Sequence, residues 1–235
     1  MLKSLLDIIF PDVCPFCEER QQQGLLCKPC RAELDSLRIT GPICIVCGLP
    51  FASLAASDHT CGKCLKQDVP FIEARSAFEY SGNLREALHR FKYGQRFILA
   101  RPFGRMLSDF AASFSSKPDI AVPVPLHKKR LRARGFNQSL LLARVISKRL
   151  SIGLDYLTLR RTRETAPQIE LSADERQKNV AGAFEAINPS AFKGRSVLLV
   201  DDVFTTGATV KECAKVLKKA GASVRVLTLA RAIQK

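Results

Sequence analysis

The sequence has few aromatic rings and few imidazoles. Among its 235 residues there is no Trp, and there are only three Tyr and three His, so aromatic residues make up 7% of the chain. Because bases stack on aromatic side chains, a single-stranded nucleic acid would find few stacking platforms. Any contact with a nucleic acid would therefore involve mainly its backbone and would weaken with added salt. The three histidines are scattered and form no site by themselves, although His127 adjoins a basic run discussed below.

Long apolar runs and an export signal are also missing. No segment approaches the roughly 18 unbroken apolar residues that a membrane span requires. The first residues, MLKSLLDIIFPDVC, contain neither a basic leader nor a small-residue cleavage site. We therefore expect a cytoplasmic protein with one or two domains and a buried core. Apolar residues at positions 2, 5, 6 and 9 have helical spacing, which favours a short helix docked on its own domain over a membrane-surface helix.

Positive charge is distributed unevenly along the chain. The formal net charge is +15, yet residues 1–64 hold six Lys or Arg against seven Asp or Glu. The rest of the chain holds 31 basic and 15 acidic residues. Residues 1–64 thus carry a net charge of −1, and residues 65–235 a net charge of +16. A solvated basic surface is the simplest meaning of such an excess, but its one-sided placement favours a polyanionic partner, either phosphate groups or a nucleic acid.

Eight of the nine cysteines form four C-x-x-C pairs, and Cys213 stands alone. Two such pairs complete the tetrahedral shell that zinc accepts. A disulfide scaffold is the alternative, but without an export signal the thiols should stay reduced. We therefore predict two structural Zn²⁺ sites. Their ligands are Cys14, Cys17, Cys27, Cys30, Cys44, Cys47, Cys61 and Cys64.

The four C-x-x-C motifs could share two zinc ions in either of two arrangements. Consecutive pairs close short loops, whereas an interleaved arrangement must close longer ones at a greater entropic cost. We favour two consecutive zinc ribbons. The four cysteines between residues 14 and 30 would hold the first ion, and the four between residues 44 and 64 the second. Four thiolates leave no coordination position for water or substrate, so both sites should be structural. Each centre would carry a charge of about −2, which makes this module a poor candidate for binding a polyanion.

The segment VLLVDDVFTTGAT, residues 197–209, contains the second group of candidate site residues. Its first four residues predict a buried parallel strand, residues 210–220 a helix and residues 222–232 a further strand. Asp201 and Asp202 would then lie at the carboxyl end of a strand, where parallel sheets bind ligands. The segment is neither a Walker loop nor a dinucleotide fingerprint.

A ribose 5-phosphate suits an acidic pair beside a loop of small residues. The free N–H groups at a helix N-terminus attract a phosphate, and carboxylates accept hydrogen bonds from sugar hydroxyls. A strand end with a turn and an N-cap is the plainer alternative, but it needs only one Asp or Thr. The predicted phosphate-binding residues are Thr205, Thr206, Gly207, Ala208 and Thr209.

These residues resemble the phosphoribosyl pyrophosphate signature of the type I phosphoribosyltransferases. The resemblance implies an α/β fold with a parallel sheet flanked by helices. It also implies that Mg²⁺ accompanies the pyrophosphate, and that Asp201 and Asp202 are the catalytic residues that hold the ribose hydroxyls.

The whole chain also resembles ComF-type proteins, a competence-associated group in which a small double zinc ribbon precedes a phosphoribosyltransferase-like domain. FKYGQR at 91–96, VPVPLHKKRLRARGFNQS at 122–139 and RRTRETAPQIELSADERQKNVAGAF at 160–184 carry this resemblance. It implies a ribbon module at 1–66 and a phosphoribosyltransferase-like domain at 67–235. It also implies a role in DNA uptake, with single-stranded DNA and DNA-uptake proteins as partners.

Two basic stretches complete the candidate site. The resemblance places the pyrophosphate loop at the run after Pro125 and a mobile lid around residues 160–179, so His127, Lys128 and Arg160 are predicted to contact the substrate. Five cations exceed what one pyrophosphate can contact, so part of the run would meet a nucleic-acid backbone, although a solvated face is the common alternative. The predicted nucleic-acid contacts are Lys128, Lys129, Arg130, Arg132 and Arg134.

The sequence leaves two functions open. One is a Mg²⁺-dependent phosphoribosyltransferase with an unidentified acceptor. The other is a non-catalytic module that handles single-stranded DNA and uses the same pocket as a ligand sensor.

Overall fold

The computed structural model describes residues 13–19, 26–52, 57–112, 114, 116–165 and 172–233. Its centre is a parallel five-stranded sheet with the strand order β1-β7-β6-β2-β3. A separate antiparallel pair is formed by β4 and β5. The strands are β1 (Glu73–Glu79), β2 (Ile120–Pro123), β3 (Gly153–Leu154), β4 (Leu159–Arg161), β5 (Phe184–Ala186), β6 (Ser196–Phe204) and β7 (Ser223–Arg231). The helix predicted near residues 2–9 lies outside the described residues.

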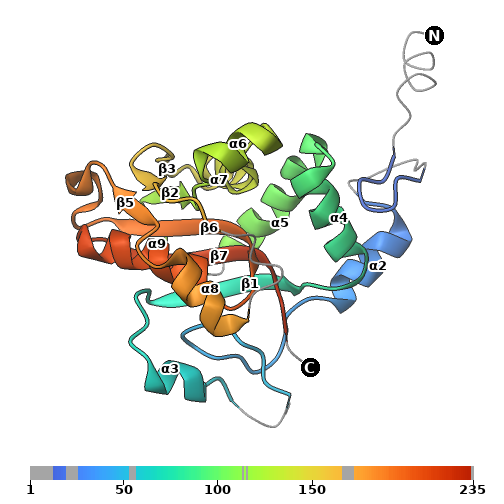
Figure 1. Cartoon of the computed structure of the whole chain (residues 1–235). Coiled ribbons are helices and arrows are strands. Elements are labelled where there is room, and N and C mark those ends of the chain that lie inside the picture. The colour runs from blue at the N-terminus through green and yellow to red at the C-terminus, as the bar shows by residue number, and fades with distance from the viewer. Residues whose placement is uncertain are drawn as a thin grey trace.

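Helices cover both faces of this sheet. Figure 1 shows α4, α5 and α7 on one face and α8 and α9 on the other. The helices are α2 (Lys28–Ser36), α3 (Gly62–Lys66), α4 (Gly82–Tyr93), α5 (Ala100–Ala111), α6 (Lys128–Arg134), α7 (Gln138–Leu150), α8 (Ala173–Val180) and α9 (Ala208–Lys219), with short 3₁₀ turns at η1 (Phe97–Leu99) and η3 (Pro189–Phe192). The predicted α/β class with a helix-flanked parallel sheet is confirmed.

Strand β6 is buried on both faces because it lies between β7 and β2 in the sheet. Its residues alternate between two apolar clusters. Leu198 and Val200 pack with α5 and α7, whereas Val197 and Leu199 pack with α9. Such continuous apolar runs are typical of parallel strands covered by helices. The pattern confirms the buried strand predicted at residues 197–200 and places its carboxyl end beside α7.

The strand, loop, helix and strand predicted for residues 197–232 are present as β6, α9 and β7. Gly221 ends the turn after α9 in a left-handed conformation, with φ at +87°. Helix α7 is capped by Asn137, whose side chain accepts from the N–H groups of Ser139 and Leu140. Cys213 is fully buried in α9.

The basic run after Pro125 differs from the loop that the resemblance implied, because residues 128–134 form helix α6. The run contains only Lys, Arg, Leu and Ala, which are all favourable in a helix. Gly135 then ends the helix with φ at +80°, a conformation that glycine adopts at little cost. A helix directs these side chains around its axis, so they cannot all contact one ligand.

Both cysteine-rich segments pack directly on the sheet unit. In the first, Phe16 and Leu34 belong to the same apolar cluster as α4 and α5. In the second, Ala74 of β1 donates to the carbonyl of Val46 at 2.7 Å. Figure 1 shows α2 beside α4 and α3 beneath β1. The predicted boundary between residues 66 and 67 stays a prediction.

Among the residues that the structure describes, no helix is both long enough and apolar enough to cross a bilayer.

Candidate functional site

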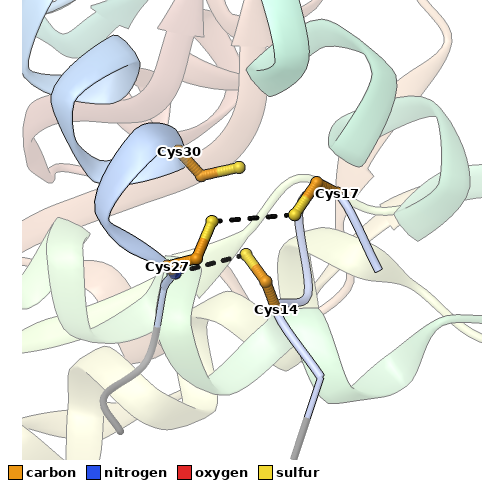
Figure 2. A group of neighbouring side chains, drawn as sticks. All are labelled: Cys14, Cys17, Cys27 and Cys30. Atoms are coloured by element: carbon orange, nitrogen blue, oxygen red, sulfur yellow. Dashed lines mark hydrogen bonds between the residues drawn. The ribbon is translucent and has the colours of Figure 1, made fainter. Parts of the chain in front are cut away.

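Two groups of four cysteines lie at separate places in the N-terminal segment. Within each group the sulfur atoms are all within 4.8 Å of one another. Figure 2 shows the sulfurs of the first group, Cys14–Cys30, directed toward a common centre. The second group consists of Cys44, Cys47, Cys61 and Cys64. This grouping confirms that consecutive C-x-x-C pairs, and not interleaved ones, come together.

The spacing of the sulfurs fits zinc. The Sγ atoms of Cys17 and Cys27 are 3.6 Å apart, and those of Cys47 and Cys61 are 3.8 Å apart. A tetrahedron with zinc–sulfur bonds of about 2.3 Å has edges of roughly 3.8 Å. Both groups therefore have the donor type, the number and the spacing of a structural zinc site.

Backbone N–H groups directed at the first cysteine of each group favour its thiolate. Cys44 Sγ accepts from the N–H groups of Cys47 at 3.4 Å and Cys61 at 3.3 Å. Burial raises the pKa of the Cys44 thiol, but these hydrogen bonds outweigh burial and lower the pKa to about 6. The pKa of Cys14 is lowered to about 7 for the same reason, with the N–H groups of Cys17 and Cys27 as donors. Thiolates are the form that binds zinc.

A cavity of about 720 Å³ opens at the carboxyl end of β6. Its volume lies within the roughly 300–1,000 Å³ of small-molecule sites. One wall is the end of β6 with the start of α9, and the other walls come from α4, α6 and α7. The lining side chains include Tyr80, Arg85, His89, Lys92, Tyr93, Arg130, Arg134, Gln138, Ser139, Arg161, Arg176, Asp201, Asp202, Phe204, Thr205, Gly207, Ala208 and Thr209.

Asp201 and Asp202 have different partners within this cavity. Asp201 Oδ1 accepts from the Ser139 hydroxyl at 2.8 Å and from the backbone N–H of Asp202 at 2.9 Å. Asp202 Oδ2 forms an ion pair with Lys92 Nζ at 3.1 Å. Helices α7 and α4 thus each contribute one side chain that fixes a carboxylate at the end of β6.

Electrostatic interactions in this cavity shift the pKa values of Asp201 and Lys92. Burial, and then the adjacent Asp202, raise the pKa of Asp201 to about 7, although Ser139 and Lys92 act in the opposite direction. Burial alone would lower the pKa of Lys92, but Asp202 and Asp201 outweigh it and the net pKa is raised. Lys92 therefore stays a cation, and Asp201 changes its protonation near neutral pH.

The loop between β6 and α9 presents a helix N-terminus to the cavity. Gly207 is the N-cap residue of α9 with φ at +78°. A Cβ atom here would lie 2.5 Å from Cζ of Phe204, so the position requires glycine. The Thr206 hydroxyl accepts from the N–H of Ala208 at 3.4 Å. The N–H groups of the first turn of α9 and the positive end of the helix dipole can bind an anion.

Most of the predicted residues of the acidic pair and the loop line the cavity, namely Asp201, Asp202, Thr205, Gly207, Ala208 and Thr209. Thr206, His127, Lys128 and Arg160 do not, although the structure describes all four. In β4, Arg160 is exposed and the next residue, Arg161, is buried and lines the cavity. Side chains of a strand alternate between its faces, so a shift of one residue reverses their direction.

Helix α6 divides the basic run into two sets. Arg130 and Arg134, one turn apart, line the cavity. The guanidinium of Arg134 lies 4.8 Å from the centre of the Tyr93 ring. The other set is exposed to solvent outside the cavity lining and consists of Lys128, Lys129 and Arg132.

The lining side chains that sequence reasoning missed include Lys92, Ser139 and Arg161. Lys92 is part of the FKYGQR motif, which carried the resemblance without a role for its lysine. Ser139 ends the motif at 122–139, and its hydroxyl donates to Asp201, whereas Asn137 caps the helix. The ion pair of Lys92 with Asp202 and the hydrogen bond of Ser139 to Asp201 leave no signal in the local sequence, because the partners are more than 60 residues apart.

Two family descriptions match the chain. Residues 5–65 match a double zinc ribbon domain, and residues 137–235 match a phosphoribosyl transferase domain. The DNA utilization protein YhgH of Escherichia coli K12 is 34% identical over 95% of this chain and 98% of its own length. Competence protein F of Haemophilus influenzae is 35% identical over 88% of this chain and 90% of its own.

A third relative is the competence protein ComFC of Bacillus subtilis, which is 33% identical over 88% of this chain and 84% of its own length. All three relatives thus match this chain across most of their own lengths, through both the cysteine-rich segment and the α/β unit. The chain therefore belongs to the competence protein F (ComF) family, in which a double zinc ribbon precedes a phosphoribosyltransferase-type domain.

Proposed function

We propose that the chain binds phosphoribosyl pyrophosphate together with Mg²⁺ in the cavity at the end of β6, and that it acts in DNA uptake. The observation that carries the first part is the position of two carboxylates and a glycine-capped helix N-terminus on one wall of a single cavity. The loop of residues 205–209 would hold the 5-phosphate. Asp201 and Asp202 would accept the ribose hydroxyls.

Cations that other elements contribute to the cavity lining suit the pyrophosphate group. Arg130 and Arg134 come from α6, and Arg161 comes from β4. Arg130 is oriented by a 3.0 Å hydrogen bond to the carbonyl of Thr165. Guanidinium groups pair with phosphate oxygens through two parallel hydrogen bonds, which adds geometric selectivity to charge attraction. In this proposal the cavity separates the two ends of the ligand, with the monophosphate at α9 and the pyrophosphate at α6.

A Mg²⁺ ion would enter with the pyrophosphate. The only groups of three or more metal-ligating side chains among the described residues are the two cysteine clusters. Asp202 is paired with Lys92, and Oδ1 of Asp201 already accepts two hydrogen bonds, so neither offers a free set of carboxylate ligands. Mg²⁺ commonly binds through substrate phosphates and water with few protein ligands. When bound, the ion would neutralise charge on the pyrophosphate.

The residues around the acidic pair would orient the sugar. Ser139 holds one oxygen of Asp201, and Lys92 fixes Asp202 from the other side. Above pH 7 Asp201 becomes an anion and a stronger acceptor for a hydroxyl. In a phosphoribosyl transfer, positive charge develops on the sugar, and two adjacent carboxylates would stabilise it.

The DNA role draws on the relatives and on α6. Two relatives are named as competence proteins and one as a DNA utilization protein. The exposed Lys128, Lys129 and Arg132 would contact a nucleic-acid backbone beside the mouth of the cavity. A non-catalytic module that senses the ligand while it handles single-stranded DNA is the second candidate, because the basic residues divide between the cavity and the surface.

Calorimetric titration with phosphoribosyl pyrophosphate and Mg²⁺ tests the pocket. Asp201→Asn/Asp202→Asn should weaken binding at least about tenfold, because charge-assisted hydrogen bonds to two hydroxyls are lost. The control is Asp109→Asn, which removes an exposed carboxylate on α5 and should leave the affinity unchanged. Equal affinity in the double variant and the native chain would disprove the pocket assignment.

Release of pyrophosphate separates the two candidates. The zinc-loaded chain is incubated with phosphoribosyl pyrophosphate, Mg²⁺ and each of a panel of nucleobases. Steady release with one base identifies a transferase and its acceptor. Tight binding without release under any condition supports the sensing module.

A further inference from the structure

Arg231, at the end of β7, is a buried cation that contacts the second zinc ribbon. Its exposed fraction is 6%. Nη1 donates to the carbonyl of Cys47 at 2.7 Å, and Nη2 lies 3.8 Å from the sulfur of the same residue. Among the residues that the structure describes, the polar contacts of this guanidinium go to Cys47 and not to a carboxylate. The ribbon is therefore its polar partner, and a centre of four thiolates and one Zn²⁺ would supply the compensating negative charge.

The same guanidinium also contacts the candidate phosphate site. It lies 4.4 Å from the centre of the Phe204 ring, and Phe204 is opposite Arg231 in the register of β6 and β7. Phe204 is 3% exposed and lines the cavity. Its ring lies directly against Gly207, the N-cap of α9, because any Cβ there would meet the ring at 2.5 Å. One side chain thus joins Cys47 to the ring that supports the loop.

We propose that Arg231 is a positioning residue through which the second zinc ribbon holds Phe204 and the loop of residues 205–209 in place. The ion fixes the turn from Cys44 to Gly48, and this turn fixes the guanidinium. The guanidinium in turn holds the ring on which the loop lies. A buried arginine that loses its partner is strongly destabilised, so loss of the ion displaces Arg231 and releases the ring.

Among its described residues, 13–19 and 26–36, the first ribbon makes no comparable contact with this loop. It contacts α4 and α5, where Arg90 donates to the carbonyl of Phe16 and the ring of Phe16 lies 5.6 Å from that of Phe103. The two zinc sites therefore differ in role. The second site supports the phosphate loop, and the first supports the helices on one face of the sheet.

The test compares matched variants of the full, zinc-loaded chain. Cys64→Ser opens the second site and Cys17→Ser the first, and both cysteines are partly exposed. Arg231→Met removes the guanidinium. Its control is Arg225→Met on the same strand, where Arg225 pairs with Glu73 at 3.2 Å. Elemental analysis should give about two zinc ions per native chain and about one in each cysteine variant.

Hydrogen exchange of the amides at 204–209 is the primary measurement. We expect about tenfold faster exchange in Cys64→Ser and Arg231→Met, from the loss of a desolvated cation–π contact and its hydrogen bond. Cys17→Ser and Arg225→Met should exchange at the native rate. Arg231→Lys should recover part of the protection, because an ammonium group can still reach the Cys47 carbonyl. A purely structural role would give no such rescue.

Binding of phosphoribosyl pyrophosphate is the second measurement, and only this part rests on the proposed function. Affinity should fall in Cys64→Ser and Arg231→Met, the two variants in which the amides at 204–209 are expected to exchange faster. If the native chain binds no ligand, the proposed function fails while the exchange data still decide the coupling. The coupling is overturned if Cys64→Ser and Cys17→Ser affect the loop equally. It is also overturned if Arg231→Met leaves loop exchange at the native rate.

Discussion

The hydroxyl of Ser139 donates a 2.8 Å hydrogen bond to Oδ1 of Asp201, across 62 positions of sequence. This bond joins the first turn of α7 to the carboxyl end of β6. Asn137, two residues earlier, caps α7 and leaves the Ser139 hydroxyl free to point at the carboxylate. The capped first turn of α7 thus places a hydrogen-bond donor at the acidic pair.

The first prediction concerns Ser139→Ala. The Ser139 hydroxyl lowers the pKa of Asp201, so its removal should raise that pKa above its native value of about 7. Carbon-detected NMR of the aspartate carboxyl groups measures the change. Ser147→Ala is the control, since Ser147 also lies in α7 and donates to the carbonyl of Ile152 at 2.7 Å. An Asp201 pKa that falls or stays constant in Ser139→Ala would show that the hydrogen bond does not favour the anion.

The second prediction is a pH-dependent gain in stability from Asp201→Asn. Between about pH 4 and 7, the folded chain binds more protons at Asp201 than the unfolded chain, because its folded-state pKa is raised to about 7. Its contribution to the free energy of unfolding therefore falls as pH rises through this window. Asn does not titrate, so the variant does not lose stability in this way. Its amide oxygen can still accept from the Ser139 hydroxyl.

Urea unfolding at pH 5 and pH 8 measures this difference. We expect Asp201→Asn to exceed the native chain by on the order of 2 kcal/mol at pH 8, and by much less at pH 5. The exposed control Asp109→Asn should show no such pH dependence. A variant that is less stable than the native chain at pH 8 would mean that the Asp201 carboxylate is stabilised in the fold.

A third prediction follows from the contact of Gly207 with Phe204. Gly207→Ala places a Cβ 2.5 Å from the ring at a φ of +78°, so the loop must shift. We expect a loss of about 1–3 kcal/mol in the free energy of unfolding and weaker binding of phosphoribosyl pyrophosphate. Gly182→Ala is the control, because its φ is +64° but nothing lies within 4 Å of the new atom. Similar ligand affinity in both variants would remove the loop from the binding site.

The fourth prediction separates the two sets of cations on α6. Replacing Lys128, Lys129 and Arg132 with Gln should weaken binding to single-stranded DNA. It should also reduce the slope of log affinity against log salt by up to about two units, since each phosphate contact contributes about 0.7. Affinity for phosphoribosyl pyrophosphate should be unchanged. The matched control replaces Lys215, Lys218 and Lys219 of α9 with Gln, which removes the same charge elsewhere. If both triple variants lose DNA affinity equally, net charge and not α6 accounts for binding.

Local patterns in the sequence predict much of this fold. The strand and helix of residues 197–219 follow from an apolar run and a helical period, and the zinc pairing follows from loop lengths. Contacts between distant segments leave no such pattern. The ion pair of Lys92 with Asp202 and the contact of Arg231 with Cys47 depend on how α4 and the second ribbon pack on the sheet.

Short elements limit prediction in a different way. Strand β4 has three residues, so its sequence does not reveal which of Arg160 and Arg161 faces inward. At α6, the resemblance pointed to a loop, whereas the composition of residues 128–134 favours the helix that forms. Local propensity was the better guide there.

The most direct test of the central proposal is a crystal structure of the zinc-loaded chain with phosphoribosyl pyrophosphate and Mg²⁺. We predict the 5-phosphate within hydrogen-bond distance of the amides at the start of α9, and the ribose hydroxyls at Asp201 and Asp202. The pyrophosphate should face Arg130 and Arg134. Density for the ligand elsewhere, or an empty cavity at a saturating concentration, would contradict the account.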